Sequence, residues 1–535
     1  MGIVALSINP ELYTDSQQKP DIDRKFVDDL FWLTFYHQHL GQEYSGLATL
    51  ASYSEKPFLL RTHRGLFRDK FESDLSGFEA PLGVGHISGG FREPYQILSS
   101  SFGNFIICFA GNLSNKEEII SKLVNKGQGL DRTDDVALIA RLIGEAGYDS
   151  SKKMSDNILS ALSHMTYQIE GAYALAILIR NKIYVARGPD AHECLTIGKK
   201  KGAVSVVSES NSFFNQGFEI VRELTPGEVI YLKSDEFWEV GKISILKGKS
   251  IIAQPCSFKW VYTSDPAAIL NDLSAAEARS RLGAKHARRD MAKGFIPHFI
   301  LPVPVSGRFH ALGYKREFDR ALNRGEINQV PYYNEDLEKY SYSGRSYTPA
   351  TQIQRDLEAR KKIIPIRKYI NLELIEASHK NVKLLLDDRL IEARVHDGRC
   401  VIEIDVVLLD DSIVRGTQTA NNLIPKLKKV FSNSISEIIE KLSQRIKVTV
   451  KLNIHLRVGD PKLVSVCDWG KSNKEQNNLA AVDPETGRIR SSEEIAERSG
   501  VATCYFSEVK DISDALGIPL TNLCVDCNLI KKDKR

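Results

Sequence analysis

The sequence predicts two folds in succession: an α+β sandwich of antiparallel sheets covered by helices, and then an α/β domain built on a parallel sheet. Its 535 residues are too many for one hydrophobic core, since single cores stop growing at about 250–300 residues. In the first half, short apolar runs alternate with Gly, Asn, Ser and Pro, as in antiparallel sheets. In the second half the order becomes strand then helix, which is typical of parallel sheets.

The expected elements follow from apolar periodicity. Strands of the first half are expected at Gly2–Ser7, Leu47–Ser52, Gly83–Ile87, Phe105–Ala110, Ala172–Ile179, Ile183–Ala186, Ala203–Ser208 and Glu228–Leu232. Its helices are expected within Asp23–His39, Lys116–Lys126, Asp134–Ala146 and Asp156–Tyr167. The second half should contain strands at Phe299–Pro304, Val406–Leu409 and Ile446–His455, and helices at Ala311–Tyr314 and Ala420–Val430. Two charged, weakly patterned stretches, Tyr369–Gly398 and Ser432–Arg445, are interpreted as insertions.

Composition excludes several classes of protein. Lys and Arg number 72 and Asp and Glu 68, so the formal charge of +4 gives no reason to expect nucleic-acid binding. No stretch of about 18 consecutive apolar residues occurs, and the N-terminus lacks the features of a signal peptide. We therefore expect a cytoplasmic protein without a membrane span. In that reducing compartment, the eight cysteines should be free, catalytic or metal-bound rather than paired in disulfides.

The most specific string runs from Val406 to Thr419 and reads VVLLDDSIVRGTQT. Two adjacent carboxylates, Asp410 and Asp411, end an apolar strand, and a turn with hydroxyl groups and a glycine then opens a helix. Such an arrangement can bind ribose hydroxyls and present backbone N–H groups to a phosphate. An acid pair alone could also close an ordinary turn, but the whole string is far more specific than the pair.

This string resembles the type I phosphoribosyltransferases, and among them the amidophosphoribosyltransferases that begin purine synthesis. The resemblance implies that Asp410 and Asp411 bind the ribose hydroxyls of phosphoribosyl diphosphate. It also implies that the following turn binds the 5-phosphate through Ser412, Val414, Arg415, Gly416 and Thr417.

Two further strings fit the same resemblance. LPVPVSGR at Leu301–Arg308 is similar to the diphosphate loop of the family, where Ser306 and Gly307 would let the backbone approach the diphosphate and Mg²⁺. Val305 stands where an acidic residue is expected, and an ordinary strand-to-helix turn remains the alternative. KYSYSGRSY at Lys339–Tyr347 is similar to the loop that closes over the substrate, and Arg345 would clamp the diphosphate.

The implied reaction is displacement of diphosphate from the sugar by ammonia, giving 5-phosphoribosylamine. Cationic side chains and Mg²⁺ neutralise the leaving group in such transfers, so the protein needs no covalent nucleophile. The resemblance implies that Ser306, Asp410 and Asp411 hold the Mg²⁺, and that Arg345, Asp410 and Asp411 form the catalytic set.

The first half is similar to the class II glutamine amidotransferase domain, an N-terminal-nucleophile hydrolase that releases ammonia from glutamine. Matching segments occur in the family's order at Gly2–Leu6, Gln38–Glu43, Gly85–Ile87, Gly111–Asn115, Thr133–Asp134, Gly171–Tyr173 and Thr225–Glu228. Asp134, which would bind the substrate amine, is retained. The resemblance therefore implies a domain over residues 1–250, followed by a phosphoribosyltransferase domain over 251–535.

Four positions of this first domain depart from the family. Met1 precedes Gly2 where the nucleophilic cysteine is expected, and a thioether cannot form the thioester. Leu40 and Ser88 replace arginines, and Ala110 replaces the asparagine of the oxyanion hole. Loss of one such donor costs about 10²–10³ in rate. We expect an inactive glutaminase; a misassigned start with a cysteine just upstream is the alternative for Met1 alone.

The C-terminal pair Cys524 and Cys527 forms a CxxC motif that could be redox-active, zinc-binding or incidental. Together with Cys256 and Cys467 it resembles the ligand pattern of amidophosphoribosyltransferases that carry a [4Fe–4S] cluster. A Cys₄ zinc site and four unliganded thiols remain alternatives. The other four cysteines are expected as core or surface thiols: Cys108, Cys194, Cys400 and Cys504.

The sequence thus leads to one main hypothesis and two alternatives. The main hypothesis is an ammonia-dependent amidophosphoribosyltransferase, supplied with free ammonia or by a partner glutaminase. One alternative is a regulatory paralogue that binds phosphoribosyl diphosphate or nucleotides and co-assembles with an intact enzyme. The other is a phosphoribosyltransferase with a different acceptor. The resemblance also implies a homo-oligomer.

Overall fold

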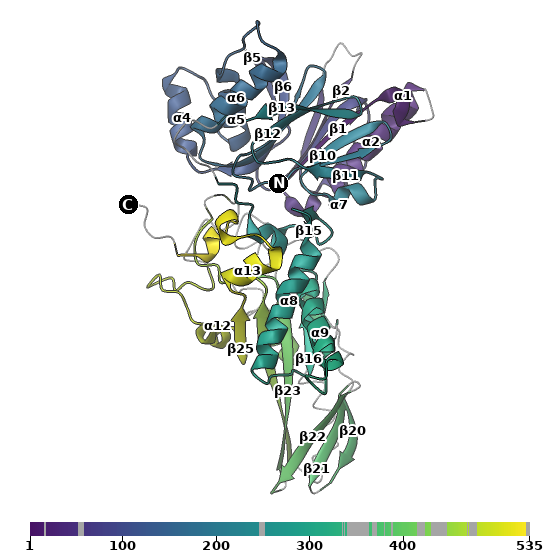
Figure 1. The fold of residues 1–535 in the computed structure, drawn as a ribbon, viewed down its shortest axis with the longest axis vertical. Coiled ribbons are helices and arrows are strands. Elements are labelled where there is room, and N and C mark those ends of the chain that lie inside the picture. The colour runs from purple at the N-terminus through teal and green to yellow at the C-terminus, as the bar shows by residue number, and fades with distance from the viewer. Residues whose placement is uncertain are drawn as a thin grey trace.

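Figure 1 shows the computed structural model of the chain, with the first half above and the second half extending below it. The structure describes residues 1–14, 18–51, 58–244, 252–333, 335, 337–339, 363–365, 372–378, 380–386, 389–397, 399–414, 423–429, 447–467, 469 and 479–530. Within these ranges, no helix has both the length and the apolar character that a membrane crossing requires.

The upper part is built on two antiparallel sheets. One has the strand order β11-β9-β10-β1-β4-β2-β3 and the other the order β13-β12-β8-β7-β6-β5. Their strands are β1 (Gly2–Ile8), β2 (Tyr44–Ala51), β3 (Leu59–Arg64), β4 (Pro81–Ser88), β5 (Tyr95–Ser100), β6 (Gly103–Leu113), β7 (Gly171–Ile179), β8 (Lys182–Arg187), β9 (Thr196–Lys200), β10 (Ala203–Val207), β11 (Glu219–Glu223), β12 (Glu228–Lys233) and β13 (Glu236–Lys242). Five of the eight runs expected as strands match β1, β7, β8, β10 and β12 to within a residue at both ends. The runs expected at Leu47–Ser52, Gly83–Ile87 and Phe105–Ala110 fall on β2, β4 and β6, which begin two or three residues earlier.

Helices cover the outer face of each sheet, so the part is layered helix, sheet, sheet, helix. The helices are α1 (Pro10–Tyr13), α2 (Lys19–Phe35), α3 (Phe67–Phe71), α4 (Lys116–Asn125), α5 (Asp135–Glu145), α6 (Met154–Gln168) and α7 (Asn211–Phe214), with a 3₁₀ turn at Gln38–Leu40. Separate apolar clusters lie under α2, between the sheets and under α5 and α6. Strand β1 is buried along its whole length because it is covered on both faces, which explains its continuous apolar run.

The lower part contains a parallel core with neighbouring strands β17, β16, β23, β24 and β25. Its strands are β14 (Ile269–Leu270), β15 (Leu273–Ser274), β16 (Phe299–Pro302), β17 (Tyr332–Tyr333), β18 (Leu337–Lys339), β19 (Ile363–Pro365), β23 (Arg399–Asp410), β24 (Lys447–Val458) and β25 (Thr503–Phe506). Along β23, Val406 and Leu408 pack into one apolar cluster and Val407 and Leu409 into another on the opposite face. Burial on both faces explains the unbroken apolar run of this strand.

Helices and short turns complete the lower part. They are α8 (Ala275–Ala292), α9 (Arg308–Asn323), α12 (Ser492–Ser499) and α13 (Val509–Leu516), with turns at Lys259–Thr263, Leu520–Asn522 and Asp526–Asn528. The pair α8 and α9 covers one face of β16 and β23. Helix α13 and the tail after it lie at the junction with the upper part (Figure 1), where Leu523 and Val525 pack with Cys194 of that part.

The stretch at 369–398, interpreted as an insertion, contains three regular strands. Its described residues form the antiparallel strands β20 (Leu372–Ala377), β21 (Asn381–Leu386) and β22 (Arg389–His396), which join the first residues of β23. They project from the far end of the lower part in Figure 1. The second predicted insertion, 432–445, lies outside the described residues.

Candidate functional site

Two loops that follow neighbouring parallel strands meet at one edge of the lower sheet. β16 and β23 pair with Pro302 opposite Leu409, so the chain leaves both strands at the same level. The turn at 303–307 follows β16, and Asp410 and Asp411 close β23. The Val303 N–H donates a hydrogen bond of 2.8 Å to the Leu409 carbonyl, which holds the turn against the end of β23. The predicted diphosphate and ribose loops are therefore adjacent.

Gly307 makes this close approach possible. A Cβ atom at this position would overlap the Leu409 carbonyl oxygen, so only glycine fits. Ser306 beside it is half-buried, whereas the Val305 side chain is 49% exposed. The turn can thus offer backbone N–H groups and one hydroxyl to a diphosphate.

The acid pair is buried and fixed by hydrogen bonds. The Asp411 N–H donates to Asp410 Oδ1 at 2.9 Å, and the Ser412 hydroxyl donates to Asp411 Oδ1 at 2.9 Å. The loop after β24 is tied to the same pair, because the Gly459 N–H donates to the Asp410 carbonyl at 2.9 Å and the Asp460 N–H to the Asp411 carbonyl at 2.7 Å. Both carboxylates are therefore held at the strand end with a defined backbone.

Asp460 is a third buried acid at this edge, and it was not among the predicted site residues. Its side chain is 1% exposed. Burial raises the pKa of Asp460 well above its ordinary value; the charge of Asp411 adds to this rise and the amide of Asn528 opposes it. The strand before it, β24, alternates polar and apolar residues, so it lacks the unbroken apolar run that marked β23 and the acid pair.

Four predicted site residues lie outside the described residues: Arg345, Arg415, Gly416 and Thr417. The described part of the phosphate turn ends at Val414, which is half-buried like Ser412. The roles of all these residues stay predictions.

The four cysteines of the predicted cluster converge at the junction between the two parts. Cys256 and Cys524 lie side by side in a short parallel bridge, in which the Cys524 N–H donates to the Pro255 carbonyl at 3.0 Å. The Cys527 carbonyl accepts hydrogen bonds from the Val464 N–H at 2.8 Å and the Ser465 N–H at 3.1 Å, which brings the tail beside the segment that carries Cys467. The remaining four cysteines are all buried, as expected of core thiols.

Cys256, Cys467, Cys524 and Cys527 lie close enough to affect one another's pKa values. Burial raises the pKa of Cys256 to about 12, and the neighbouring Cys467 adds to the rise. Burial likewise raises the pKa of Cys524 and Cys527, to which the other cluster cysteines contribute. Four thiolates in so small a space need compensating positive charge, which the irons of a cluster can supply. No group of three or more His, Cys, Asp or Glu in the described part of the chain is arranged to hold a single metal ion.

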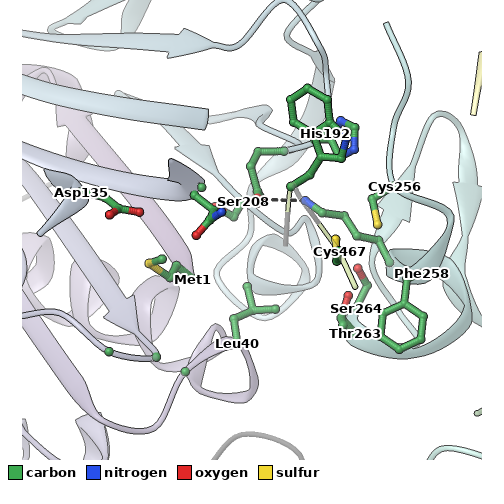
Figure 2. A pocket seen from close by; sticks show the side chains of 18 of the residues that line it. Met1, Leu40, Asp135, His192, Ser208, Cys256, Phe258, Thr263, Ser264 and Cys467 are labelled. Carbon is green, nitrogen blue, oxygen red and sulfur yellow. Dashed lines mark hydrogen bonds and ion pairs between the residues drawn. The ribbon is translucent and has the colours of Figure 1, made fainter. Parts of the chain in front are cut away.

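A cavity of about 400 Å³ lies between the two parts, and Figure 2 shows Met1 and Leu40 on one side of it and Cys256 and Cys467 on the other. Apolar side chains make up much of its wall: Met1, Leu40, Phe91, Leu113, Phe258, Leu270, Leu463 and Trp469. Its charged residues are paired. Lys116 Nζ lies 3.6 Å from Asp135 Oδ1, and Lys259 Nζ lies 2.7 Å from Glu193 Oε2.

The retained residues of the first domain have structural partners. His86 is fully buried, and its Nε2 lies 2.9 Å from the Phe109 carbonyl oxygen, as expected of a core histidine. Asp134 caps helix α5 through the Ala137 N–H at 3.3 Å and pairs with Arg132 at 2.6 Å. Asp135 lines the cavity in its place.

A residue pair across the cavity was also missed. The His192 ring of the upper part stacks on Trp469 of the lower part, with ring centroids 4.7 Å apart. Burial lowers the pKa of His192 to about 4. Trp469 lies two residues after Cys467, but no sequence pattern predicts its contact with His192, because that contact depends on how the two parts pack.

Comparison with solved structures shows the class of fold. Glutamine phosphoribosylpyrophosphate amidotransferase from Bacillus subtilis, complexed with ADP and GMP, superposes with a TM-score of 0.71 at 21% identity, covering 98% of this chain and 96% of that one. A structure described as the allosteric regulatory enzyme of purine biosynthesis gives 0.72 at 22% identity, covering 98% and 95%. The fold is therefore an N-terminal-nucleophile-hydrolase-like sandwich followed by a type I phosphoribosyltransferase domain, as predicted.

Sequence comparison leads to the particular family. The profile of the glutamine amidotransferase domain matches residues 91–215. The amidophosphoribosyltransferase of Methanocaldococcus jannaschii is 26% identical over 96% of this chain and 94% of its own length, and that of Bacillus subtilis is 25% identical over 90% and 85%. The chain is thus related to the amidophosphoribosyltransferases along nearly its whole length, which confirms the resemblance predicted from the sequence.

Proposed function

We propose that the chain is a pentosyltransferase of the amidophosphoribosyltransferase type that forms 5-phosphoribosylamine from phosphoribosyl diphosphate and ammonia, in the first step of purine synthesis. The names of its relatives support this class of reaction. One contrast supports ammonia as the nitrogen donor. The buried acid pair is held against the turn at Gly307, whereas Leu40 and paired charges line the cavity between the two parts. We place the division between the two domains at residue 250.

The lower site can bind and orient the sugar without forming a covalent bond to it. Asp410 and Asp411 would accept hydrogen bonds from the ribose hydroxyls, and the turn from Ser412 to Thr417 would hold the 5-phosphate. The turn at 303–307 would receive the diphosphate, with Arg345 as its clamp. Ser306, Asp410 and Asp411 present the oxygen atoms that Mg²⁺ prefers. When bound, Mg²⁺ neutralises charge on the leaving diphosphate.

We propose that Cys256, Cys467, Cys524 and Cys527 hold a [4Fe–4S] cluster. Their convergence from the domain junction, the second domain and the tail supports this assignment. A [4Fe–4S] cluster takes four thiolate ligands, which is the number that these residues can supply. The cluster would fasten the C-terminal tail across the junction.

We propose ammonia as the nitrogen donor, either free or delivered by a partner glutaminase. Leu40, Ser88 and Ala110 cannot supply the charge and the donor that the glutaminase reaction needs, whatever precedes Gly2. The Ser88 hydroxyl lies 3.8 Å from Met1 Sδ, so two of the positions that depart from the family contact each other. We also expect a homo-oligomer, as in the family.

The test is diphosphate release from phosphoribosyl diphosphate and Mg²⁺ by anaerobically purified protein. Release with ammonium and none with glutamine is the expected result. Release with glutamine would contradict the proposal for the first domain. If the protein binds the sugar but releases no diphosphate with either donor, the result favours a regulatory paralogue or another acceptor. The exposed Val305, which stands in the diphosphate turn where an acidic residue is expected, would support these two alternatives.

A further inference from the structure

The segment from Gly459 to Ser465 connects the acid pair to the cysteine-containing tail. At its beginning, the Gly459 and Asp460 N–H groups donate to the carbonyls of Asp410 and Asp411 at 2.9 and 2.7 Å. These bonds continue the pairing of β23 with β24 beyond its last pair, which joins Asp410 to Val458. The position of the acid pair therefore depends on where this segment lies.

The other end of the segment is bound by the tail. Asn528 Nδ2 donates to the carbonyls of Pro461 at 3.2 Å and Lys462 at 3.4 Å. The Cys527 carbonyl accepts from the Val464 and Ser465 N–H groups at 2.8 and 3.1 Å. Each of these bonds joins residues more than 60 positions apart in the sequence, so it exists only when the tail is docked.

The segment is too constrained to absorb a shift of the tail. A Cβ atom at Gly459 would overlap the ring of His310, which is itself buried. Pro461 fixes its own backbone φ. The Asp460 side chain is buried as well. A displacement at Asn528 is therefore transmitted to Asp410 and Asp411 rather than lost in a flexible loop.

We propose that Asn528 is a positioning residue for the phosphoribosyl site: by binding Pro461 and Lys462, it holds the segment 459–465 and thereby the backbone of Asp410 and Asp411. The cysteine group, which consists of Cys256, Cys467, Cys524 and Cys527, has the same effect through the Cys527 carbonyl, which binds Val464 and Ser465. The tail is thus part of the sugar site although it does not line it. The effect on ligand binding rests on the proposed function, whereas the mechanical link does not.

The experiment compares Asn528→Ala with the matched variant Asn522→Ala, which removes an exposed asparagine from the same tail. Hydrogen exchange of the Gly459 and Asp460 amides is measured in the full-length, anaerobically purified protein. Loss of the Asn528 hydrogen bonds should speed exchange at these two amides on the order of tenfold. Asn522→Ala should leave them as in the unmodified chain. Iron content is measured in parallel and should be equal in all three proteins.

A binding measurement with phosphoribosyl diphosphate and Mg²⁺ accompanies the exchange data. Asn528→Ala should weaken binding several-fold and raise KM while kcat at saturation is retained, which a general loss of stability would not produce. Unchanged exchange at Gly459 and Asp460, or acceleration spread evenly over the protein, would overturn the inference. If the unmodified chain does not bind the sugar, the proposed function fails, and the exchange comparison still decides the link.

Discussion

The two domains retain their folds equally well but differ in what their sites present. At the end of β23, carboxylates and backbone donors are held in place by hydrogen bonds and by the close approach at Gly307. The upper domain contributes Met1 and Leu40 to the wall of the cavity between the two domains, and its Lys116 is paired with Asp135 there. The cores of the two sheets of this domain do not include Leu40, Lys116 or Asp135, so the fold does not depend on which residues stand at these positions.

Direct contacts across the junction hold the upper domain against the lower one. Lys259 pairs with Glu193 across the junction, and Cys194 packs with Leu523 and Val525 of the tail. These contacts stabilise the lower domain and its cysteine group whether or not glutamine is cleaved. We infer that the upper domain is retained as a scaffold.

The comparison predicts its largest effect at the acid pair. Asp411→Asn removes the charge that would bind a ribose hydroxyl and should lower kcat/KM for ammonium-dependent diphosphate release on the order of 10²-fold or more. Asp397→Asn, at an exposed turn before β23, is the matched control and should be neutral. An Asp411→Asn protein with unchanged kcat/KM would show that the acid pair is not the site.

The cysteine group should show the next largest effect. Cys467→Ser removes one of the four proposed ligands and should lower bound iron from about four per chain to near zero, with a loss of thermal stability because cluster binding is coupled to folding. Cys400→Ala, at a buried cysteine away from the junction, should keep its iron. Equal iron in both variants, or zinc in place of iron, would contradict the cluster.

The stability of the protein should depend on pH through His192, which lies at the junction of the two domains. Burial lowers the pKa of His192 from 6.5 to about 4, so the unfolded imidazole binds a proton at a pH where the folded one stays neutral. Above pH 6.5 His192 is neutral in both states and costs the folded state nothing. As the pH falls from 6.5 towards 4, only the unfolded chain gains this proton, so the free energy of unfolding falls by up to about 3 kcal/mol.

The variant His192→Phe keeps the stack on Trp469 but cannot titrate. Its urea unfolding free energy should therefore change less between pH 6.5 and about 4.5 than that of the unmodified chain. His396→Phe, at an exposed histidine, should follow the unmodified chain. Parallel pH curves for His192→Phe and the unmodified chain would rule out this role of His192.

The smallest effect is expected in the upper domain. Ala110→Asn replaces a buried residue of β6 with the side chain that the glutaminase reaction would use. Because Leu40 and Ser88 still lack the charge for a substrate carboxylate, glutamate release from glutamine should stay at background. Measurable glutaminase activity in this single variant would show that the domain is closer to activity than we propose.

Much of the fold and of the ribose site could be predicted, because their residues are neighbours in the sequence. The string from Val406 to Thr419 carries a strand, its acid pair and its turn together, so the ribose loop could be located from sequence. The alternation of short apolar runs also located eight of the thirteen described strands of the upper domain, but not β3, β5, β9, β11 and β13. The cysteine group needed the resemblance, because no local spacing connects Cys256 with Cys524.

Features that depend on packing were missed. Strands β20–β22 carry charges on their outer face, where Lys383 lies 3.3 Å from Glu376 and 3.4 Å from Glu392, so the segment looked weakly patterned although Val382 and Leu384 are buried. Asp460 became part of the site only because β24 lies beside β23. Such neighbours are set by strand order, which the sequence of one segment does not contain.

The most direct test of the central claim is a competition between the two nitrogen donors. Purified protein is given phosphoribosyl diphosphate, Mg²⁺, isotope-labelled ammonium and unlabelled glutamine in one reaction, and the aminated sugar is trapped and analysed by mass spectrometry. A lower domain that works beside a silent glutaminase should give a product that carries only the labelled nitrogen. Unlabelled product in proportion to the glutamine supplied would contradict the account.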